Sequence, residues 1–134
     1  IWMDWVDAIH TPEDLWEDMQ MNLVAPCAYY YGIYDQEQLI GMWEVHHVDE
    51  ERETAEIGYW LIPPARKQGW LINTWPRLLG ILQDRFKRLE MRCHVHNEPG
   101  LRFARTVANF EGILSRAESL HDQRVDMVLF SIIL

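Results

Sequence analysis

The middle of the chain alternates between apolar runs and short polar stretches, a pattern typical of strands joined by tight turns. Residues 39–48 and 54–62 are rich in apolar and aromatic side chains, and the polar stretch 49–53 between them predicts a hairpin. A further run at 27–34 predicts a strand before this pair, followed by a turn at 35–38. Three consecutive strands with short connections predict an antiparallel meander.

Helical patterns flank the three predicted strands. Thr11, Pro12 and Asp14 form a helix-start signature, which predicts a helix that ends before Pro26. After the third strand, apolar residues at helical spacing predict a helix over residues 70–86. The rest of the chain predicts a strand, a short helix and one or two closing strands, with the clearest patterns at 89–96, 100–109 and 125–134.

Proline residues mark the end of the third strand and interrupt the helix that follows. Pro63 and Pro64 stop the strand, and we expect Pro76 to kink the helix or delay its start. Gly80 also weakens this helix. The order of elements predicts an α+β fold, with a mixed sheet that carries helices on its faces. A length of 134 residues is typical of one domain, so we expect a single domain over residues 1–134.

The composition sets bounds on the compartment and the partners. The net charge of -9 argues against a nucleic-acid partner, because binding phosphate groups requires a basic surface. The longest apolar run is shorter than the ~20 residues that a membrane span needs. The first residues carry no targeting signal. We therefore expect a cytoplasmic protein with no membrane partner, in which Cys27 and Cys93 are free thiols rather than a disulfide.

The loop between the third strand and the next helix has the character of an anion site. It holds Arg66, Lys67 and Gly69, and the N–H groups at a helix start stabilise a bound anion. Glycine in such a turn lets the backbone approach a phosphate closely. Taken alone, the loop is a weak signal and is more simply interpreted as a basic surface turn.

Several motifs together resemble the GNAT superfamily of acyl-CoA-dependent N-acetyltransferases. They are "AEIGYWL", the loop "RKQG", "RCHVHNEPG", "FEGILSRAESL" and "VDMVLFSIIL", in the order and nearly the spacing of the family. The opening "WMDWVDAIHTPED" and these motifs are most similar to the RimJ/RimL-like branch, which acetylates protein N-termini. The resemblance implies a GNAT-like, mixed and mostly antiparallel sheet flanked by helices, beginning after the family's usual first strand and helix.

The resemblance implies that acetyl-CoA is the co-substrate and assigns residues to it. In the family, the fourth strand pairs with the pantetheine arm, a Gly-rich loop binds the pyrophosphate through backbone amides, and an Asn lies near the pantetheine. Carried onto this sequence, the cofactor residues are Ile57, Gly58, Tyr59, Trp60, Leu61, Arg66, Lys67, Gln68, Gly69, Trp70, Leu71 and Asn97.

The resemblance also implies how the amine is activated. Glu118 in "SRAESL" maps onto a Glu proposed as the general base in RimL-like enzymes. A carboxylate near the amine, acting directly or through water, can take the proton that the attacking amine loses. Gly100 stands where the family places a Ser that protonates the thiolate, and we expect its absence to reduce the rate by about 10²-fold.

The acceptor is implied to be a primary amine, such as a protein or peptide N-terminus of the ribosomal-protein type. Glu56 and Trp5 are candidate acceptor-binding residues. A charge on the solvent-exposed face of the sheet is an equally simple interpretation of Glu56, and core packing is the simpler interpretation of Trp5. Two histidine pairs invite a metal interpretation, His46–His47 and His94–His96. No Cys or carboxylate stands at ligand spacing, so we expect no metal site.

Some departures from the family pattern leave a second function open. Leu71 occupies a position that is usually small, and "VANFEG" is shorter than the family's segment. The alternative is a catalytically silent GNAT-fold module that binds acyl-CoA weakly or associates with itself. A homodimer would cover an exposed sheet edge in either case.

Overall fold

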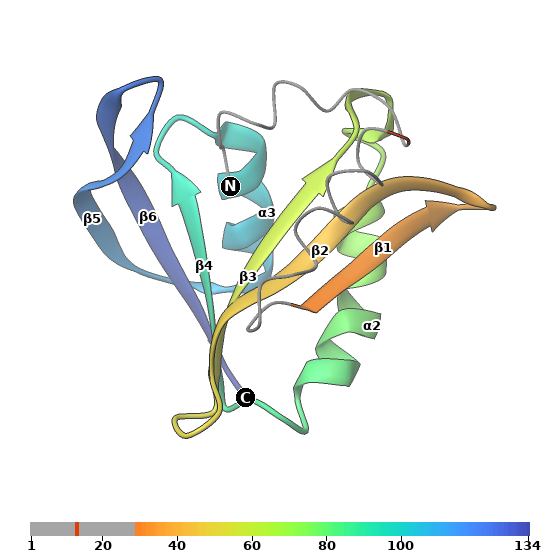
Figure 1. The fold of residues 1–134 in the computed structure, drawn as a ribbon, viewed down its shortest axis with the longest axis horizontal. Helices are drawn as coiled ribbons and strands as arrows, with labels where there is room; N and C mark the ends of the chain where they lie inside the picture. The colour runs from red at the N-terminus through yellow and green to blue at the C-terminus, as the bar shows by residue number, and fades with distance from the viewer. Residues whose placement is uncertain (1–12, 14–28) are drawn as a thin grey trace.

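The computed structural model describes Glu13 and residues 29–134, which form one six-stranded sheet with helices packed on it (Figure 1). The strand order is β1-β2-β3-β4-β6-β5. The predicted first helix, Trp5 and Cys27 lie outside the described residues. The strands are β1 (Tyr29–Asp35), β2 (Gln38–Asp49), β3 (Thr54–Leu61), β4 (Arg88–His94), β5 (Asn109–Leu120) and β6 (Gln123–Ile133).

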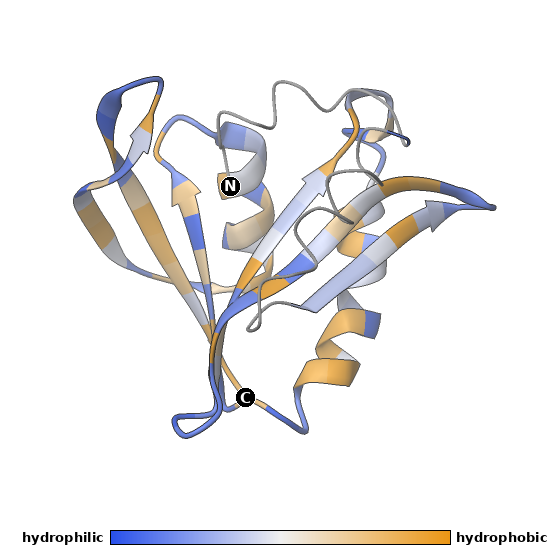
Figure 2. Cartoon of the chain, viewed as in Figure 1, coloured by the Kyte–Doolittle hydropathy of each residue, from blue (hydrophilic) through white to orange (hydrophobic). Residues whose placement is uncertain are grey.

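The first three strands form the predicted antiparallel meander. β1 pairs with β2, and β2 pairs with β3 in a register that sets Val45 opposite Ile57. The connection between β2 and β3 is hydrophilic, whereas β2 is hydrophobic near its start, after the turn from β1 (Figure 2). This contrast is what the alternation of apolar runs and polar stretches predicted.

The contact between β3 and β4 is parallel and short. Only three pairs join the two strands, from Thr54 opposite Arg88 to Glu56 opposite Glu90. β4 pairs along its whole length with β6, from Arg88 opposite Ile133 to His94 opposite Met127. Beyond Glu56, β3 therefore keeps β2 on one side, and none of the six described strands pairs with its other side, so the sheet opens between β3 and β4.

Two helices cover the same face of the sheet. They are α2 (Trp70–Leu82), which crosses over between β3 and β4, and α3 (Glu98–Val107), between β4 and β5. Trp43 of β2 and Tyr59 of β3 contact Phe103 of α3 at ring-centroid distances of 5.5 and 4.9 Å. Trp75 of α2 lies 5.5 Å from Trp43. This aromatic cluster joins both helices to the strands beside the opening.

The helix ends differ from the predicted ones for local reasons. α2 ends at Leu82 rather than at residue 86, because the chain turns and buries Phe86 completely beneath the sheet end. Pro76 lies inside α2 without delaying its start at Trp70. α3 begins two residues early, because the Asn97 side chain accepts a hydrogen bond from Gly100 N and caps the helix.

The described residues also bear on the expected free thiols, on membrane-spanning helices and on the closing strands. Cys93 is a buried free thiol, as predicted. No helix in the described part of the chain is long and apolar enough to cross a membrane. Of the one or two closing strands expected, the structure has two, the β5–β6 hairpin, and Glu111 links the outer strand β5 to the rest of the sheet. This carboxylate pairs with Arg88, which lowers its pKa to about 2, and accepts a hydrogen bond from Ser131.

Candidate functional site

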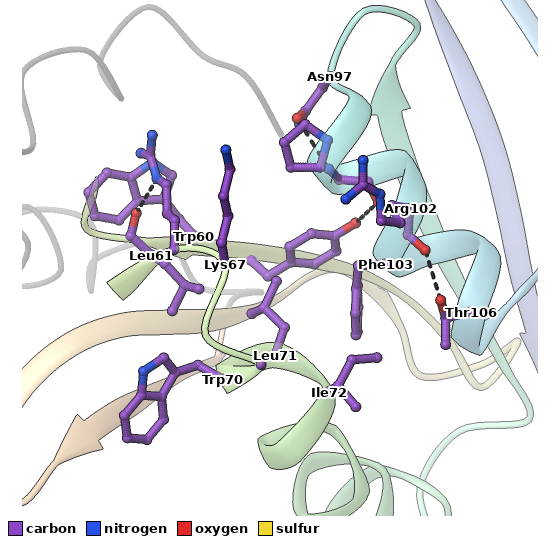
Figure 3. Close-up of a pocket in the computed structure, with 15 residues that line it drawn as sticks. Trp60, Leu61, Lys67, Trp70, Leu71, Ile72, Asn97, Arg102, Phe103 and Thr106 are labelled. Carbon is purple, nitrogen blue, oxygen red and sulfur yellow. Dashed lines mark hydrogen bonds between the residues drawn. The ribbon is translucent and has the colours of Figure 1, made fainter. Parts of the chain in front are cut away.

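A cavity of about 440 Å³ lies where β3 and β4 separate. Its walls come from the end of β3, the loop that leads into α2 with the first turn of that helix, and one side of α3 (Figure 3). The lining residues are Tyr59, Trp60, Leu61, Arg66, Lys67, Gly69, Trp70, Leu71, Ile72, Asn97, Pro99, Gly100, Arg102, Phe103 and Thr106.

The loop before α2 and the first turn of that helix line this cavity. Gly69 is the N-cap residue in the left-handed region, with φ of 82°, and no side chain caps the helix. Lys67 also has a positive φ, 62°. Because the first N–H groups of a helix have no partner within it, they are free to bind an anion. Gly69 adopts this backbone without the strain that a side chain would bring.

Arg66 fastens the loop to the end of β3. Its Nε donates a hydrogen bond to Leu61 O at 3.0 Å, and its guanidinium lies 5.4 Å from the centre of the Trp60 ring. Partial burial lowers the pKa of Arg66, yet a guanidinium stays charged at neutral pH. Arg66 therefore sets the loop geometry and contributes a positive charge at the rim.

The charge of the cavity is opposite to that of the chain. Arg66, Lys67 and Arg102 line it, and no acidic residue is among the lining residues that the structure describes. The whole chain carries a net charge of -9. Positive side chains and open N–H groups around one concave, mostly apolar space favour an elongated ligand with phosphate groups at one end.

Tyr59 bridges the opening between β3 and α3. Its hydroxyl donates a hydrogen bond to Gly100 O at 2.9 Å and lies 3.4 Å from Cys93 Sγ. Burial raises the pKa of Tyr59 well above its ordinary value and also raises the pKa of Cys93. Both groups are therefore neutral at physiological pH, and Tyr59 acts as a hydrogen-bond donor that fixes the width of the site.

Asn97 and Gly100 depend on each other at the start of α3. A Cβ at position 100 would lie 2.7 Å from Asn97 Nδ2, which is closer than side-chain atoms approach. Glycine at this position allows Asn97 to accept from Gly100 N at 3.2 Å while lining the cavity. A serine at position 100 would displace the Asn97 amide that caps α3. The absence of the serine hydroxyl expected from the family is therefore linked to the way α3 is capped.

The structure brings most of the expected cofactor residues together but leaves others outside the cavity. Ile57 and Gly58 are buried in β3, below the cavity. The side chain of Gln68 donates to Pro64 O at 2.7 Å instead. Glu118 is exposed on β5, and Glu56 lies among charged side chains of the sheet; neither lines the cavity.

Sequence reasoning missed several lining residues on the two helices. Ile72 comes from α2, and Pro99, Arg102, Phe103 and Thr106 come from α3. A signal for the four α3 residues was available, because positions 99, 102, 103 and 106 follow the spacing of one helical face. The sequence pattern identified the apolar residues only as core positions, since periodicity does not distinguish a residue that lines a cavity from one that packs in the core.

Tyr59→Phe tests the bridge across the opening. The substitution removes the partner of a buried carbonyl, which should lower the free energy of unfolding by about 1 to 3 kcal/mol. Tyr34→Phe is the matched control, since Tyr34 is 49% exposed and should change stability by less than about 0.5 kcal/mol. Chemical denaturation of the three proteins measures both values. Equal stability of Tyr59→Phe and the parent would contradict the bridging role.

Comparison with known proteins agrees with this geometry. The sequence model of the acetyltransferase (GNAT) domain family matches residues 2–107. The ribosomal-protein-serine acetyltransferase of Escherichia coli K12 is 27% identical over 135 residues, covering 96% of this chain and 75% of that protein.

Solved structures share the fold. RimL, the ribosomal L7/L12 alpha-N-protein acetyltransferase solved with coenzyme A, has a TM-score of 0.83 at 23% identity, covering 98% of this chain and 78% of that one. The microcin C7 self immunity acetyltransferase MccE, solved with acetyl-CoA and AMP, has a TM-score of 0.78 at 26% identity. The match covers 88% of this chain and 67% of that one. Because the family match extends over most of its length, the chain belongs to the acetyltransferase (GNAT) domain family.

Proposed function

We propose that this chain transfers acetyl from acetyl-CoA to the N-terminal amine of a protein, of the type that RimL-like enzymes acetylate. The observation that carries the proposal is the cationic cavity beside the free side of β3, in a chain of net charge -9. The ribosomal-protein-serine acetyltransferase of Escherichia coli supports the class of acceptor.

The cavity offers complementary groups for each part of acetyl-CoA. The open N–H groups at the start of α2 and the side chains of Arg66 and Lys67 suit the pyrophosphate. Arg102 provides a further positive charge on the α3 side (Figure 3). The pantetheine arm would run along residues 57–61, where β3 lacks a second neighbouring strand, with Asn97 on its other side.

The transfer then needs a base and an oxyanion donor. The amine nitrogen attacks the thioester carbonyl, the C–S bond breaks, and the CoA thiolate leaves without strong acid assistance because its pKa is low (~8.5 for a related thiol). A free N–H of β3 can stabilise the oxyanion. We assign the base to Glu118, whose hairpin lies at the same end of the sheet as the β4–α3 loop (Figure 1).

Acceptor binding, assembly and location are further parts of the proposal. We assign Glu56 and Trp5 to the acceptor amine. Glu56 lies on the face of the sheet away from α2 and α3, opposite to its neighbours in β3 that point toward the helices. A cytoplasmic homodimer is the proposed working form. The exposed side chains of Phe110 and Ile113 on the edge strand β5, 62% and 59% exposed, support a contact between copies. The mass of the chain by light scattering tests it.

Binding of acetyl-CoA is the first test. We expect calorimetric titration of the chain to show one site, and Arg66→Glu to weaken it about 10- to 100-fold, since charge-assisted hydrogen bonds contribute about 1.5 to 3 kcal/mol. Arg77→Glu makes the same charge change on α2 away from the cavity and should bind as the parent does. Equal weakening by both variants would contradict the assigned site.

Acetyl transfer is the second test. The assay uses a peptide with a free N-terminal serine, with the same peptide blocked at its N-terminus as control. Glu118→Gln should lower kcat about 10²- to 10⁴-fold, whereas Glu51→Gln, an exposed change at the hairpin tip, should not. Tight acetyl-CoA binding without transfer to any amine would contradict the enzyme and support the silent module.

A further inference from the structure

Two histidines of β2 converge on one carboxylate of β3. His47 Nδ1 lies 2.8 Å from Glu56 Oε2, and His46 Nε2 lies 3.8 Å from Glu56 Oε1. Glu56 is only 5% exposed, and it occupies the last pair before β3 and β4 separate. None of these residues lines the acetyl-CoA cavity, so the cluster is a separate feature of the sheet.

A bulge in β2 brings the adjacent histidines to the same side. Neighbouring residues of a regular strand point to opposite faces. Here the register between β2 and β3 shifts after His46, and His47 has a positive φ of 46°. The two imidazole rings lie 4.7 Å apart as a result. A bulge of this kind re-aims a side chain, and here it directs the second imidazole to Glu56.

The cluster offers a set of donor atoms suited to a metal ion. One ligand atom from each of His46, His47 and Glu56 lies within 4.8 Å of the other two. His46 Nε2 is buried and has no hydrogen-bond partner among the residues that the structure describes. Two imidazole nitrogens and a carboxylate oxygen are ligands that Zn²⁺ and neighbouring transition metals prefer.

We propose that His46, His47 and Glu56 bind one divalent transition-metal ion of the Zn²⁺ type, with a remaining position for water. Sequence reasoning expected no metal here because no carboxylate stood at ligand spacing along the chain. The carboxylate comes instead from the neighbouring strand, in the pair that sets His46 opposite Glu56. The ion and an acceptor amine would exclude each other at Glu56.

Arg92 carries a positive charge that weakens metal binding at this site. Its Nε lies 3.6 Å from Glu56 Oε2, so its guanidinium repels a metal ion bound to the same carboxylate. The same guanidinium lies 3.6 Å from Glu90 Oε2, which gives Arg92 another partner when the ion binds. Removal of this charge should therefore strengthen metal binding.

Titration of the chelator-treated chain with Zn²⁺ tests the proposal, and absorption of the Co²⁺-loaded chain reports nitrogen and oxygen ligation. We expect one ion per chain. Loss of a residue that only supports a metal ligand weakens metal binding roughly 10- to 100-fold. His47→Ala and Glu56→Gln each remove a proposed ligand, so each should weaken Zn²⁺ binding by more than that. The His47 side chain is 74% exposed, so its loss should leave the fold intact.

Two further variants separate this site from other histidines. His96→Ala removes a histidine of the second pair and should leave the affinity unchanged, whereas Arg92→Gln should raise it about tenfold or more. The proposal is overturned by absence of Zn²⁺ binding to the folded parent. It is equally overturned if His47→Ala binds as the parent does, or if His96→Ala loses the ion.

Discussion

The short parallel contact between β3 and β4 is the constraint on which the site depends. Three pairs join these strands, and β4 then pairs only with β6, which leaves residues 57–61 with a free side. The gap persists because Tyr59 reaches across it to Gly100 O and because the aromatic cluster holds α2 and α3 over the same face. A sheet closed at this point would have no room for a cofactor.

Electrostatics then selects what enters the opening. The chain is acidic as a whole, yet the cavity is lined by arginine, lysine and unpartnered helix-start N–H groups. A cluster of carboxylate and histidine side chains lies elsewhere on the sheet, formed by His46, His47, Glu56 and Glu90. The cationic cavity that we propose for the phosphates of acetyl-CoA thus lies apart from the carboxylate cluster that we propose for a cation, whether an amine or a metal ion.

Much of this arrangement could be predicted from the sequence, and the exceptions have physical reasons. The strands, the loop around Gly69 and the GNAT resemblance followed from local patterns. The end of α2 did not, because Phe86 continues the helical spacing although its burial occurs beyond the helix. The bulge at His47 could not be predicted either. Its positive φ accompanies the register shift between β2 and β3, and no glycine stands there to signal it in the sequence.

Hydrogen exchange of backbone amides, with and without saturating acetyl-CoA, tests the central claim most directly. If the cofactor takes the place of the strand that β3 lacks, exchange should slow in residues 57–61 and in the first turn of α2, at residues 69–72. The hairpin at 49–53 should exchange at the same rate in both states. Protection confined to other segments, with residues 57–61 unchanged, would contradict the account.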